Sequence, residues 1–562
     1  MKIKIICCLF ILSLIVGNAY AASKEYNLLI RSQNINLTGH DVAAMTINGG
    51  IPGPVLRFTE GETARIHVRN EMAVETSIHW HGLLLPNLQD GVPYLTTPPI
   101  KPGGSFTYEF PLKQSGTYWY HSHTGLQEQR GVYGAFVVEP LTGSSTADLE
   151  HVVVLSDWTD EDPEEVLRTL KSGNDYYSLK KGTMQSLSGA LKAGALKETL
   201  QRSLMRMPPM DIADVAYDAF LTNGGPEEEL DALPGQTVHL RIINAAASTY
   251  FYLHYAGGAL QITSADGLNV VPVDRNRFLI AVAETYDVFI TVPAGGAYEL
   301  RATAQDGSGH TSLFVGRGSR ITAPDVPFPD LYKMHAGDHT NMADPMTDDK
   351  IMKHDNMMKH NMMEMPEEER PMPPYEHLKS MLPTTLPAES PLREVRLELT
   401  GDMERYIWSI NGKTLNEADM IKIKRGENVR FVLINKTMMH HPMHLHGHFF
   451  RVLNRHGDYS PLKHTVDVPP LGETIIEFYA DEEKDWFFHC HVLYHMKAGM
   501  ARAIHYEGSE LSPQLADIRK YFQKETWYAS TEISILSQMT EGTIRIADTR
   551  NTLMLQWEAD WD

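Results

Sequence analysis

A ten-residue motif that occurs three times constrains the fold of this chain more than any other feature. Each copy begins with a turn glycine, continues as an alternating strand and ends on an asparagine nine residues later. The copies occupy residues 61–70, 235–244 and 426–435. An internal repeat indicates one supersecondary unit used several times, and an apolar/polar period of two makes that unit a β structure. We therefore predict an all-β chain built from three β-sandwich domains.

Composition and the repeat together set the expected boundaries. A chain of 562 residues is too long for a single core. We expect domains at 24–145, 146–325 and 390–507. Residues 326–389 are rich in Met, His, Asp, Glu and Pro and have no strand period, which is typical of a long mobile insertion. Residues 508–562 form an extension of unknown role, with a capped helix expected over 512–528 and a hairpin over 532–557.

The N-terminus has the pattern of a secretory signal peptide. Lys2 and Lys4 precede an apolar run over residues 5–16, and residues 19–21 supply a small-x-small cleavage site. We expect residues 1–21 to be removed on export. No other apolar stretch of the sequence approaches the roughly 20 residues of a membrane span. The formal charge of −21 disfavours nucleic acid as a partner.

Export leaves the mature chain with one cysteine, because Cys7 and Cys8 lie in the signal peptide. Cys490 can then form no intramolecular disulfide, and a free thiol is a liability in an oxidising compartment. Its neighbours in the chain are His489 and His491. Thiolate and imidazole are both metal ligands, so we expect a metal ion to hold this sulfur.

Paired histidines follow the repeated strand in the first and third copies but not in the second. Nine and eleven residues after the asparagine lie His79 and His81 in the first copy and His444 and His446 in the third. The same steps in the second copy reach Leu253 and Tyr255. Alternate residues of a strand share a face, so each His-x-His pair presents two imidazoles together.

A second block repeats in the same way. His121 and His123 correspond to His489 and His491, whereas the middle copy has Arg301 and Thr303 at these places. Cys490 stands where the other copies have Ser122 and Ala302. We therefore expect the first and third domains to share a metal centre, with the second domain as a spacer.

Ligand chemistry indicates which metal this is. Cys490, His495 and Met500 follow one another at spacings of five, and His441 supplies a further imidazole. One thiolate, two imidazoles and a weak axial thioether form the pattern of an electron-transfer copper site. Zinc usually takes a closed tetrahedral site and could not change its oxidation state by one electron.

Eight more histidines suit three further copper ions with two, three and three ligands. Full reduction of dioxygen to water takes four electrons, and one remote copper plus a cluster of three stores that number. Because Cys490 lies between two of these histidines, electrons have a short covalent route to the cluster. The eight residues are His79, His81, His121, His123, His444, His446, His489 and His491.

These motifs resemble those of the multicopper oxidases, a family that includes laccases, ferroxidases and cuprous oxidases. The resemblance covers residues 24–507 and implies three cupredoxin-like Greek-key domains, four copper ions and dioxygen as the electron acceptor. It also implies the ligand sets. Type 1 copper would take His441, Cys490, His495 and Met500; type 2 copper His79 and His444; the type 3 pair His81, His121 and His491 on one ion and His123, His446 and His489 on the other.

Oxygen reduction also needs protons. Similar enzymes have an acid after the first His-x-His motif, and Asp90 lies at the matching place. The resemblance implies that Asp90 serves the cluster with protons; the alternative is a turn aspartate before Gly91. A second acid often follows the last type 1 histidine, but here that residue is Met496. The second proton donor is therefore not identified.

The insertion suggests a reductant. Its methionines lie in a polar segment with no core to fill, among His335, His339, His354 and His360. Thioether sulfur is a soft ligand that favours cuprous ion, while scavenging of oxidants or compositional drift are the alternatives. The candidate substrate ligands are Met334, Met342, Met346, Met352, Met357, Met358, Met362 and Met363, and Met365 and Met372 continue the run.

Residues 156–163 and 282–287 resemble the periplasmic copper-resistance (CopA-type) subfamily. This implies oxidation of cuprous to cupric ion in the periplasm of a Gram-negative bacterium. The chain departs from the subfamily by lacking a twin-arginine signal and by its extension. A laccase-like phenol oxidase and a copper-sequestering protein are the alternatives. The expected partners are dioxygen and cuprous ion or another small reductant, with no nucleic acid and no membrane span, and a monomer is expected.

Overall fold

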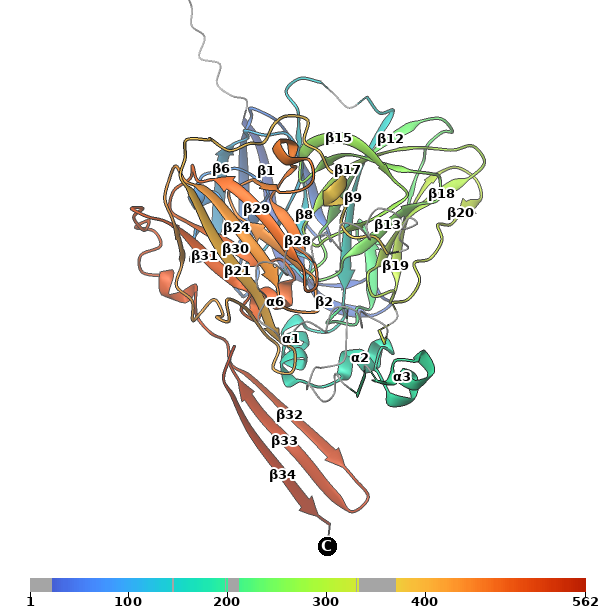
Figure 1. Cartoon of the computed structure of the whole chain (residues 1–562), viewed down its shortest axis with the longest axis vertical. Coiled ribbons are helices and arrows are strands. Elements are labelled where there is room, and N and C mark those ends of the chain that lie inside the picture. Colours follow the sequence, from blue (N-terminus) through green and yellow to red (C-terminus); the bar gives the residue numbers. More distant parts are fainter. Residues whose placement is uncertain are drawn as a thin grey trace, which may run out of the picture.

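The computed structural model describes residues 23–143, 146–197, 199–200, 212–329, 331–332 and 370–561. Strands far outweigh helices in the described chain, which confirms the expected all-β class. Two sheets pack against each other around each copy of the repeat, and a separate sheet follows at the C-terminus (Figure 1). Among the described residues, no helix is both long and apolar enough to cross a membrane.

The first pair of sheets shares a core that includes Leu28, Ile66, Trp80 and Phe136. One sheet has the order β2-β1-β4-β6 and the other β3-β8-β7-β5. Their strands are β1 (Ser23–Asn36), β2 (Asp41–Ile47), β3 (Gly53–Thr59), β4 (Thr63–Asn70), β5 (His79–His81), β6 (Ser105–Pro111), β7 (Gly116–His121) and β8 (Tyr133–Glu139).

The second pair of sheets follows the order β10-β9-β12-β17-β14-β15 and β11-β19-β18-β13-β16, with β20 beside β18. Its strands are β9 (Leu149–Trp158), β10 (Ala219–Thr222), β11 (Glu227–Leu230), β12 (Thr237–Asn244), β13 (Phe251–Tyr255), β14 (Leu260–Ala265), β15 (Leu268–Arg275), β16 (Arg277–Ile280), β17 (Thr285–Thr291), β18 (Ala297–Ala304), β19 (His310–Gly316) and β20 (Arg320–Ile321).

The third pair follows the order β22-β21-β24-β29-β26-β27 and β23-β31-β30-β25-β28. Its core is continuous with buried residues of the first two pairs, such as Trp119 and Tyr250, so the three units pack tightly together. The strands are β21 (Leu392–Asp402), β22 (Ile407–Ile410), β23 (Ile421–Ile423), β24 (Asn428–Asn435), β25 (His441–Leu445), β26 (Phe450–Val452), β27 (Leu462–Lys463), β28 (Thr465–Val468), β29 (Glu473–Tyr479), β30 (Asp485–Cys490) and β31 (Ala501–Tyr506).

The repeated motif is one structural element used three times. Its strands β4, β12 and β24 each lie inside a sheet, parallel to the strand that opens the unit and antiparallel to a later one. The closing asparagine has the same role in each copy. Asn70 donates from its amide to the carbonyls of Val74 (2.8 Å) and Ile100 (3.0 Å), and its Oδ1 accepts from the N–H of Met72. Asn244 and Asn435 make the corresponding bonds and so fix the turn before the next strand.

This turn is one residue longer in the second unit. The asparagine amide reaches the carbonyl four residues ahead in the first and third units and five ahead in the second. The strand register agrees, since His79 pairs with His121, and His254 pairs with Arg301. His254 therefore corresponds to His79, and the predicted alignment through Leu253 is wrong by one residue, because the longer turn shifts the register.

Several helices had no counterpart in the sequence-based expectations. They are α1 (Pro163–Ser172), α2 (Tyr176–Lys181), α3 (Leu187–Ala193) and α6 (Leu493–Lys497). α1 begins at Asp162, whose side chain accepts from the N–H of Glu164, and ends at the left-handed Gly173. α6 lies next to β30 and carries one of the predicted copper ligands, His495.

The segment expected to be a mobile insertion ends in a packed anchor. The short 3₁₀ helix η3 (Pro374–His377) is followed by Leu378, which is fully buried. Tyr375 donates to Glu284 of the second unit at 2.5 Å, and its backbone oxygen accepts from Asn454 of the third. The part of the insertion after residue 373 is therefore ordered structure, because its aromatic and aliphatic side chains have a core to join.

The C-terminal extension differs from its prediction. It forms a three-stranded antiparallel sheet of β32 (Tyr528–Ile535), β33 (Met539–Ala547) and β34 (Thr552–Asp560), where a two-stranded hairpin was expected. No α-helix forms over 512–528 in this described stretch, which contains turns and the 3₁₀ helix η5 (Arg519–Tyr521). Only Leu515 and Ser512 of that stretch are buried, so a helix there would have no apolar stripe to pack.

Candidate metal centres

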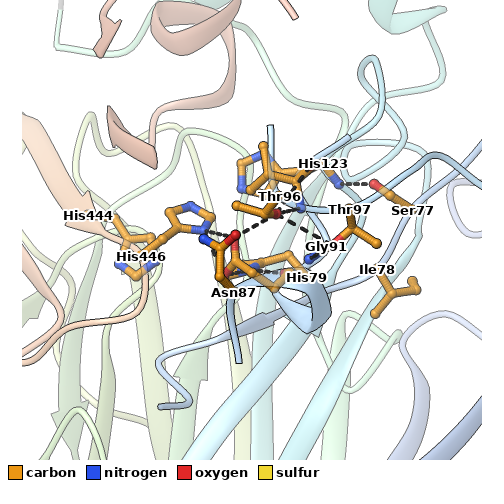
Figure 2. Close-up of polar contacts among 12 residues, drawn as sticks. Ser77, Ile78, His79, Asn87, Gly91, Thr96, Thr97, His123, His444 and His446 are labelled. Carbon is orange, nitrogen blue, oxygen red and sulfur yellow. Dashed lines mark hydrogen bonds and ion pairs between the residues drawn. The ribbon is translucent and has the colours of Figure 1, made fainter. Parts of the chain in front are cut away.

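All eight histidines of the predicted cluster lie together between the first and third units. The strands β5 and β7 carry His79, His81 and His121, and β25 and β30 carry His444 and His489. The remaining three lie one or two residues after these strands: His123, His446 and His491. All eight are buried. Figure 2 shows four of them, His79, His123, His444 and His446, facing a common space.

Ring nitrogens of these side chains approach within 4.8 Å of one another in three groups. The groups are His81, His121 and His491; His79, His81 and His444; and His79, His123 and His446. The first is a ligand set expected for one type 3 copper. The second contains both expected type 2 ligands. In the third, His79 takes the place expected for His489, whose Nε2 lies 3.1 Å from Nε2 of His446.

The donor atoms fit metal ions. Among the described residues, Nε2 of His79, His121 and His444 is buried and has no hydrogen-bond partner. The opposite nitrogen of His79 and of His444 lies 2.7 Å from a backbone carbonyl, of Asp90 and His464 respectively, so it carries the proton. A fixed Nδ1–H and a free Nε2 lone pair form the pattern of a metal-binding imidazole.

Electrostatics also favours neutral imidazoles here. Burial, followed by the charge that neighbouring imidazoles would carry, lowers the pKa of His123, His444 and His446 well below that of free histidine. A cluster of neutral rings is stable in a buried space, whereas several imidazolium ions would repel one another. The side chains are thus ready to accept cations.

Asp90 is buried at this cluster, next to two of the histidines. Its carboxylate oxygens lie 3.2 Å from Nδ1 of both His79 and His446. Thr96 donates to Asp90 Oδ2 at 3.2 Å. The following Gly91 has φ +89°, and a Cβ there would lie 1.8 Å from the carbonyl oxygen of Ile78. The loop therefore lies against the strand that carries His79, and the Asp90 side chain faces the cluster (Figure 2 shows the surrounding residues).

Glu128 is a second buried acid at the cluster, and the sequence reasoning missed it. Its Oε2 lies 2.8 Å from Nδ1 of His121. Burial, with a contribution from Asp157, raises the pKa of Glu128 well above that of free glutamate. Glu128 is only five residues after His123, so an acid close to the second His-x-His motif was the signal available.

The mononuclear centre predicted around Cys490 also assembles. Cys490 Sγ lies 3.7 Å from Nδ1 of His441 and 3.7 Å from Nδ1 of His495, and these two nitrogens are 3.2 Å apart. All three side chains are fully buried, as is Met500. The backbone of Met500 accepts from the N–H of Cys490 and donates to the carbonyl of His495, both at 3.0 Å. One thiol and two imidazoles within this distance can hold a single ion.

The outer nitrogens of the two imidazoles are held by residues that no motif indicated. Asp214 Oδ2 lies 2.8 Å from Nε2 of His495 and also accepts from the hydroxyl of Tyr406. Thr437 Oγ1 lies 2.7 Å from Nε2 of His441. Burial acts to raise the pKa of Asp214, but the charge and hydrogen bond of His495 outweigh it, so the pKa is lowered.

The second unit contributes to the cluster indirectly. Asp266 Oδ2 accepts from the backbone N–H groups of His464 and Thr465, both at 3.1 Å. The carbonyl of His464 in turn fixes Nδ1 of His444. The buried Lys463 pairs with Asp266 at 3.1 Å and with Glu284 at 3.0 Å. The unit expected to be a spacer therefore holds the strand that orients a cluster histidine.

Two predicted features lie outside the described residues. The signal peptide, residues 1–21, is one. The other is the set of candidate substrate ligands, which run from Met334 to Met363.

Family models described as multicopper oxidase match residues 29–143, 150–316 and 389–509. The chain belongs to the multicopper oxidase family, as the eight-histidine cluster and the cysteine centre had indicated. It is therefore an oxidoreductase with copper cofactors.

Among its relatives are copper resistance proteins. Copper resistance protein A of Escherichia coli is 37% identical over 86% of this chain and 92% of that protein. The Copper resistance protein A homolog of Pseudomonas syringae pv. tomato is 38% identical over the same shares. The crystal structure of Fet3p, a multicopper oxidase that functions in iron import, shares the fold with a TM-score of 0.67 at 19% identity, covering 89% of this chain and 95% of that chain.

Proposed function

We propose that this protein oxidises cuprous to cupric ion and reduces dioxygen to water, and that this activity serves copper tolerance. Four cuprous ions would each give up one electron, and one dioxygen with four protons would become two water molecules. The observation that carries the proposal is the position of Cys490. Its thiol belongs to the mononuclear centre, while its chain neighbours His489 and His491 belong to the eight-histidine cluster.

We infer four resident copper ions with the ligand sets implied by the family. His441, Cys490, His495 and Met500 would hold type 1 copper, and His79 and His444 type 2 copper. The type 3 pair would take His81, His121 and His491 on one ion and His123, His446 and His489 on the other. When bound, copper supplies one-electron redox chemistry at the first centre and four-electron dioxygen chemistry at the cluster.

The protein's own residues limit rearrangement at the mononuclear centre. Trp408 lies over His495 with ring centroids 3.9 Å apart and shields it from water. Hydrogen bonds to Asp214 and Thr437 hold both imidazoles on their outer sides. A ligand set that cannot move keeps the same geometry in both oxidation states, which favours rapid electron transfer.

Asp90 would orient the cluster and supply protons to it. Its carboxylate accepts from Nδ1–H of His446 and its backbone carbonyl from Nδ1–H of His79, which aims the opposite nitrogen of each ring inward. A proton held on Asp90 Oδ2 would lie at the edge of the cluster, with Thr96 as its hydrogen-bond neighbour. This supports the proton role over that of a simple turn residue.

Cuprous ion as reductant is supported by composition and by the relatives. The methionines from Met334 to Met363 offer soft sulfur ligands in a polar segment. Relatives at 37% and 38% identity are named as copper resistance proteins. Oxidation to cupric ion would lower the toxicity and membrane permeability of the metal. We infer that it takes place in the periplasm, after export directed by residues 1–21.

Oxygen consumption by the copper-loaded protein tests the substrate. Cuprous ion, ferrous ion and a phenol are supplied in turn, and we expect the highest kcat/KM with cuprous ion.

Replacing the eight methionines from Met334 to Met363 by leucine should raise KM for cuprous ion and leave phenol oxidation unchanged. Met381→Leu is the matched control, because Met381 is exposed and lies outside the segment. An unchanged KM for cuprous ion would refute the role of the segment.

A further inference from the structure

The C-terminal sheet has one apolar and one polar face. Cross-strand partners lie on the same face of a sheet, and alternate residues of a strand point the same way. Ile533 pairs with Gly542, which pairs with Trp557; two residues along, Ile544 pairs with Leu555. One face therefore gathers Ile533, Ile535, Ile544, Ile546, Leu553, Leu555 and Trp557. The opposite face carries residues such as Ser530, Glu532, Glu541, Thr543, Arg545, Gln556 and Glu558.

The apolar face is exposed to solvent. Exposed fractions reach 72% at Ile535, 69% at Leu553 and 60% at Leu555. Soluble proteins rarely leave so many aliphatic side chains together in water, and such a patch marks an interaction surface. The sheet projects away from the three sandwich units, below α1 (Figure 1).

Specific contacts attach the C-terminal sheet to α1 and to the third unit, and they leave the apolar face of the sheet exposed. Arg545, on the polar face, donates to the carbonyl of Lys171 in α1 at 3.1 Å, and the Lys171 ammonium lies over the ring of Tyr528. Arg550 pairs with Glu417 of the third unit at 2.8 Å. The sheet also lies beyond the family match, which ends at residue 509. It is therefore an anchored addition to the family fold.

The chemistry of the patch favours an identical patch as its partner. The face has no charged side chain, so two copies can meet without burying charge. The six aliphatic side chains leave roughly 600 Å² exposed per copy, close to the about 800 Å² per partner of a stable interface. Two amphipathic sheets packed face to face form a β-sandwich with a core about 10 Å thick.

A lipid surface fits less well. Residues 528–562 contain six acidic and two basic side chains. Anionic membranes attract basic segments and repel acidic ones. A two-fold axis, in contrast, brings the same neutral face to both partners.

We propose that the protein is a homodimer in which the sheets β32–β34 of two copies pack by their apolar faces around a two-fold axis. The dimer replaces the monomer expected from the sequence. The proposal is independent of the reductant and of the copper ligand sets.

Sedimentation equilibrium of the full-length, copper-loaded protein tests this. The wild type should sediment at twice the monomer mass at micromolar concentrations. The double variant Ile544→Asp/Leu555→Asp places two charges in the centre of the face and should sediment as a monomer with unchanged copper content and oxidase activity. Thr543→Asp/Gln556→Asp alters the neighbouring cross-strand pair on the polar face and should remain a dimer.

A cysteine cross-link gives a second measurement that does not require the aspartate variant to fold. Among the described residues the one cysteine, Cys490, is buried. Ile544→Cys should form an intermolecular disulfide under mild oxidation, and Thr543→Cys should not. A wild type that stays monomeric at tens of micromolar overturns the proposal, as does a dimer that survives both aspartate substitutions on the apolar face. Flotation of the monomeric wild type with phosphatidylglycerol vesicles would assign the face to lipid and also overturn it.

Discussion

The two candidate metal centres are built in different ways. The mononuclear centre takes His441, Cys490 and His495 from the third unit alone, within a stretch of one sheet and α6. The eight-histidine cluster takes four side chains from the first unit and four from the third. It also depends on the second unit, through Asp266 and the backbone of β28. One centre is local, and the other exists only where the units meet.

The two centres therefore depend on different contacts in the molecule. The donor atoms of the local centre all come from the third unit, and a single contact from the second unit, Asp214 on Nε2 of His495, supports them. The composite cluster should be the first to fail when contacts between units are disturbed, because its two halves are held together by those contacts. Cys490 joins the two, since its thiol lies in the mononuclear centre and its chain neighbours His489 and His491 lie in the cluster.

The largest expected effect comes from breaking this junction. Cys490→Ser should remove the intense visible absorption of thiolate-bound copper and reduce oxidase turnover to the uncatalysed background, because electrons lose their entry site. The cluster should still bind copper, which electron paramagnetic resonance of type 2 copper measures. A variant that kept its visible band or its turnover would contradict the assignment of the thiol.

A smaller effect is expected from Asp266→Asn, which weakens the support of the cluster and spares the local centre. The carbonyl of His464 would no longer be held in place for His444, and losses of such supporting contacts typically cost about 10–100-fold in metal affinity or activity. Type 2 copper content should fall while the visible band stays.

Asp274→Asn, also in the second unit, is the control for this comparison. Asp274 pairs with Gln261 on the exposed strand surface, so both centres should be unaffected. Equal loss of both copper signals in Asp266→Asn would show that the second unit does not act on the cluster selectively.

The reverse comparison uses Asp214, which contacts only the local centre. Asp214→Asn removes a negative charge 2.8 Å from Nε2 of His495 and should raise the reduction potential of the mononuclear copper, because the cupric state loses stabilisation. Turnover should change by about tenfold. Tyr406→Phe removes the hydrogen bond that Tyr406 donates to Asp214 but keeps the charge of Asp214. This variant should therefore shift the reduction potential less. Redox titration of the visible band measures the reduction potential of both variants. Equal shifts in the two variants would rule out the charge of Asp214 as the cause.

The smallest effect is expected from a substitution at Glu150, which lies away from both centres. It should change the stability of the fold and neither copper signal. Glu150 joins the first two units by ion pairs with Arg57 (2.7 Å) and Arg241 (2.8 Å). Although burial acts to raise the pKa of Glu150, hydrogen bonds from His239 and Arg241 outweigh it and lower the pKa.

The sign of the pH dependence follows from this lowered pKa. The ion pairs stabilise the fold above the pKa of free glutamate, about 4.3, and the contribution is lost as the pH falls towards the folded value. Glu150→Gln should therefore lower the thermal midpoint at pH 7 and converge with the wild type in acid. Scanning calorimetry from pH 7 to pH 3 checks this, and a difference that grew in acid would contradict it. Both copper signals should stay unchanged at pH 7.

The sequence predicted the donor residues of both centres. Strand period and motif spacing place Cys490, His495 and Met500 because these residues are close in the chain. They also place the eight histidines, since the repeat puts them on equivalent strands. Supporting residues were missed when they come from other elements. Asp214 and Asp266 are hundreds of residues from the histidines they support, and no local pattern marks them.

For the fold, too, the sequence predicted the features that depend on local patterns and missed those that do not. The repeated strand and its asparagine fixed the three units, since both act through local backbone bonds. The alignment of the second unit failed by one residue at His254, because turn length is not visible from a strand pattern. The hairpin expected over 532–557 is in fact part of three strands, β32 to β34, because a second turn divides that stretch.

The ratio of cuprous ions oxidised to dioxygen consumed tests the central claim most directly. If the mononuclear centre passes electrons through Cys490 to a complete cluster, the copper-loaded protein should oxidise four cuprous ions for each dioxygen and release no hydrogen peroxide. An oxygen electrode together with a peroxide assay measures this ratio. Two cuprous ions for each dioxygen, with stoichiometric peroxide, would contradict the account.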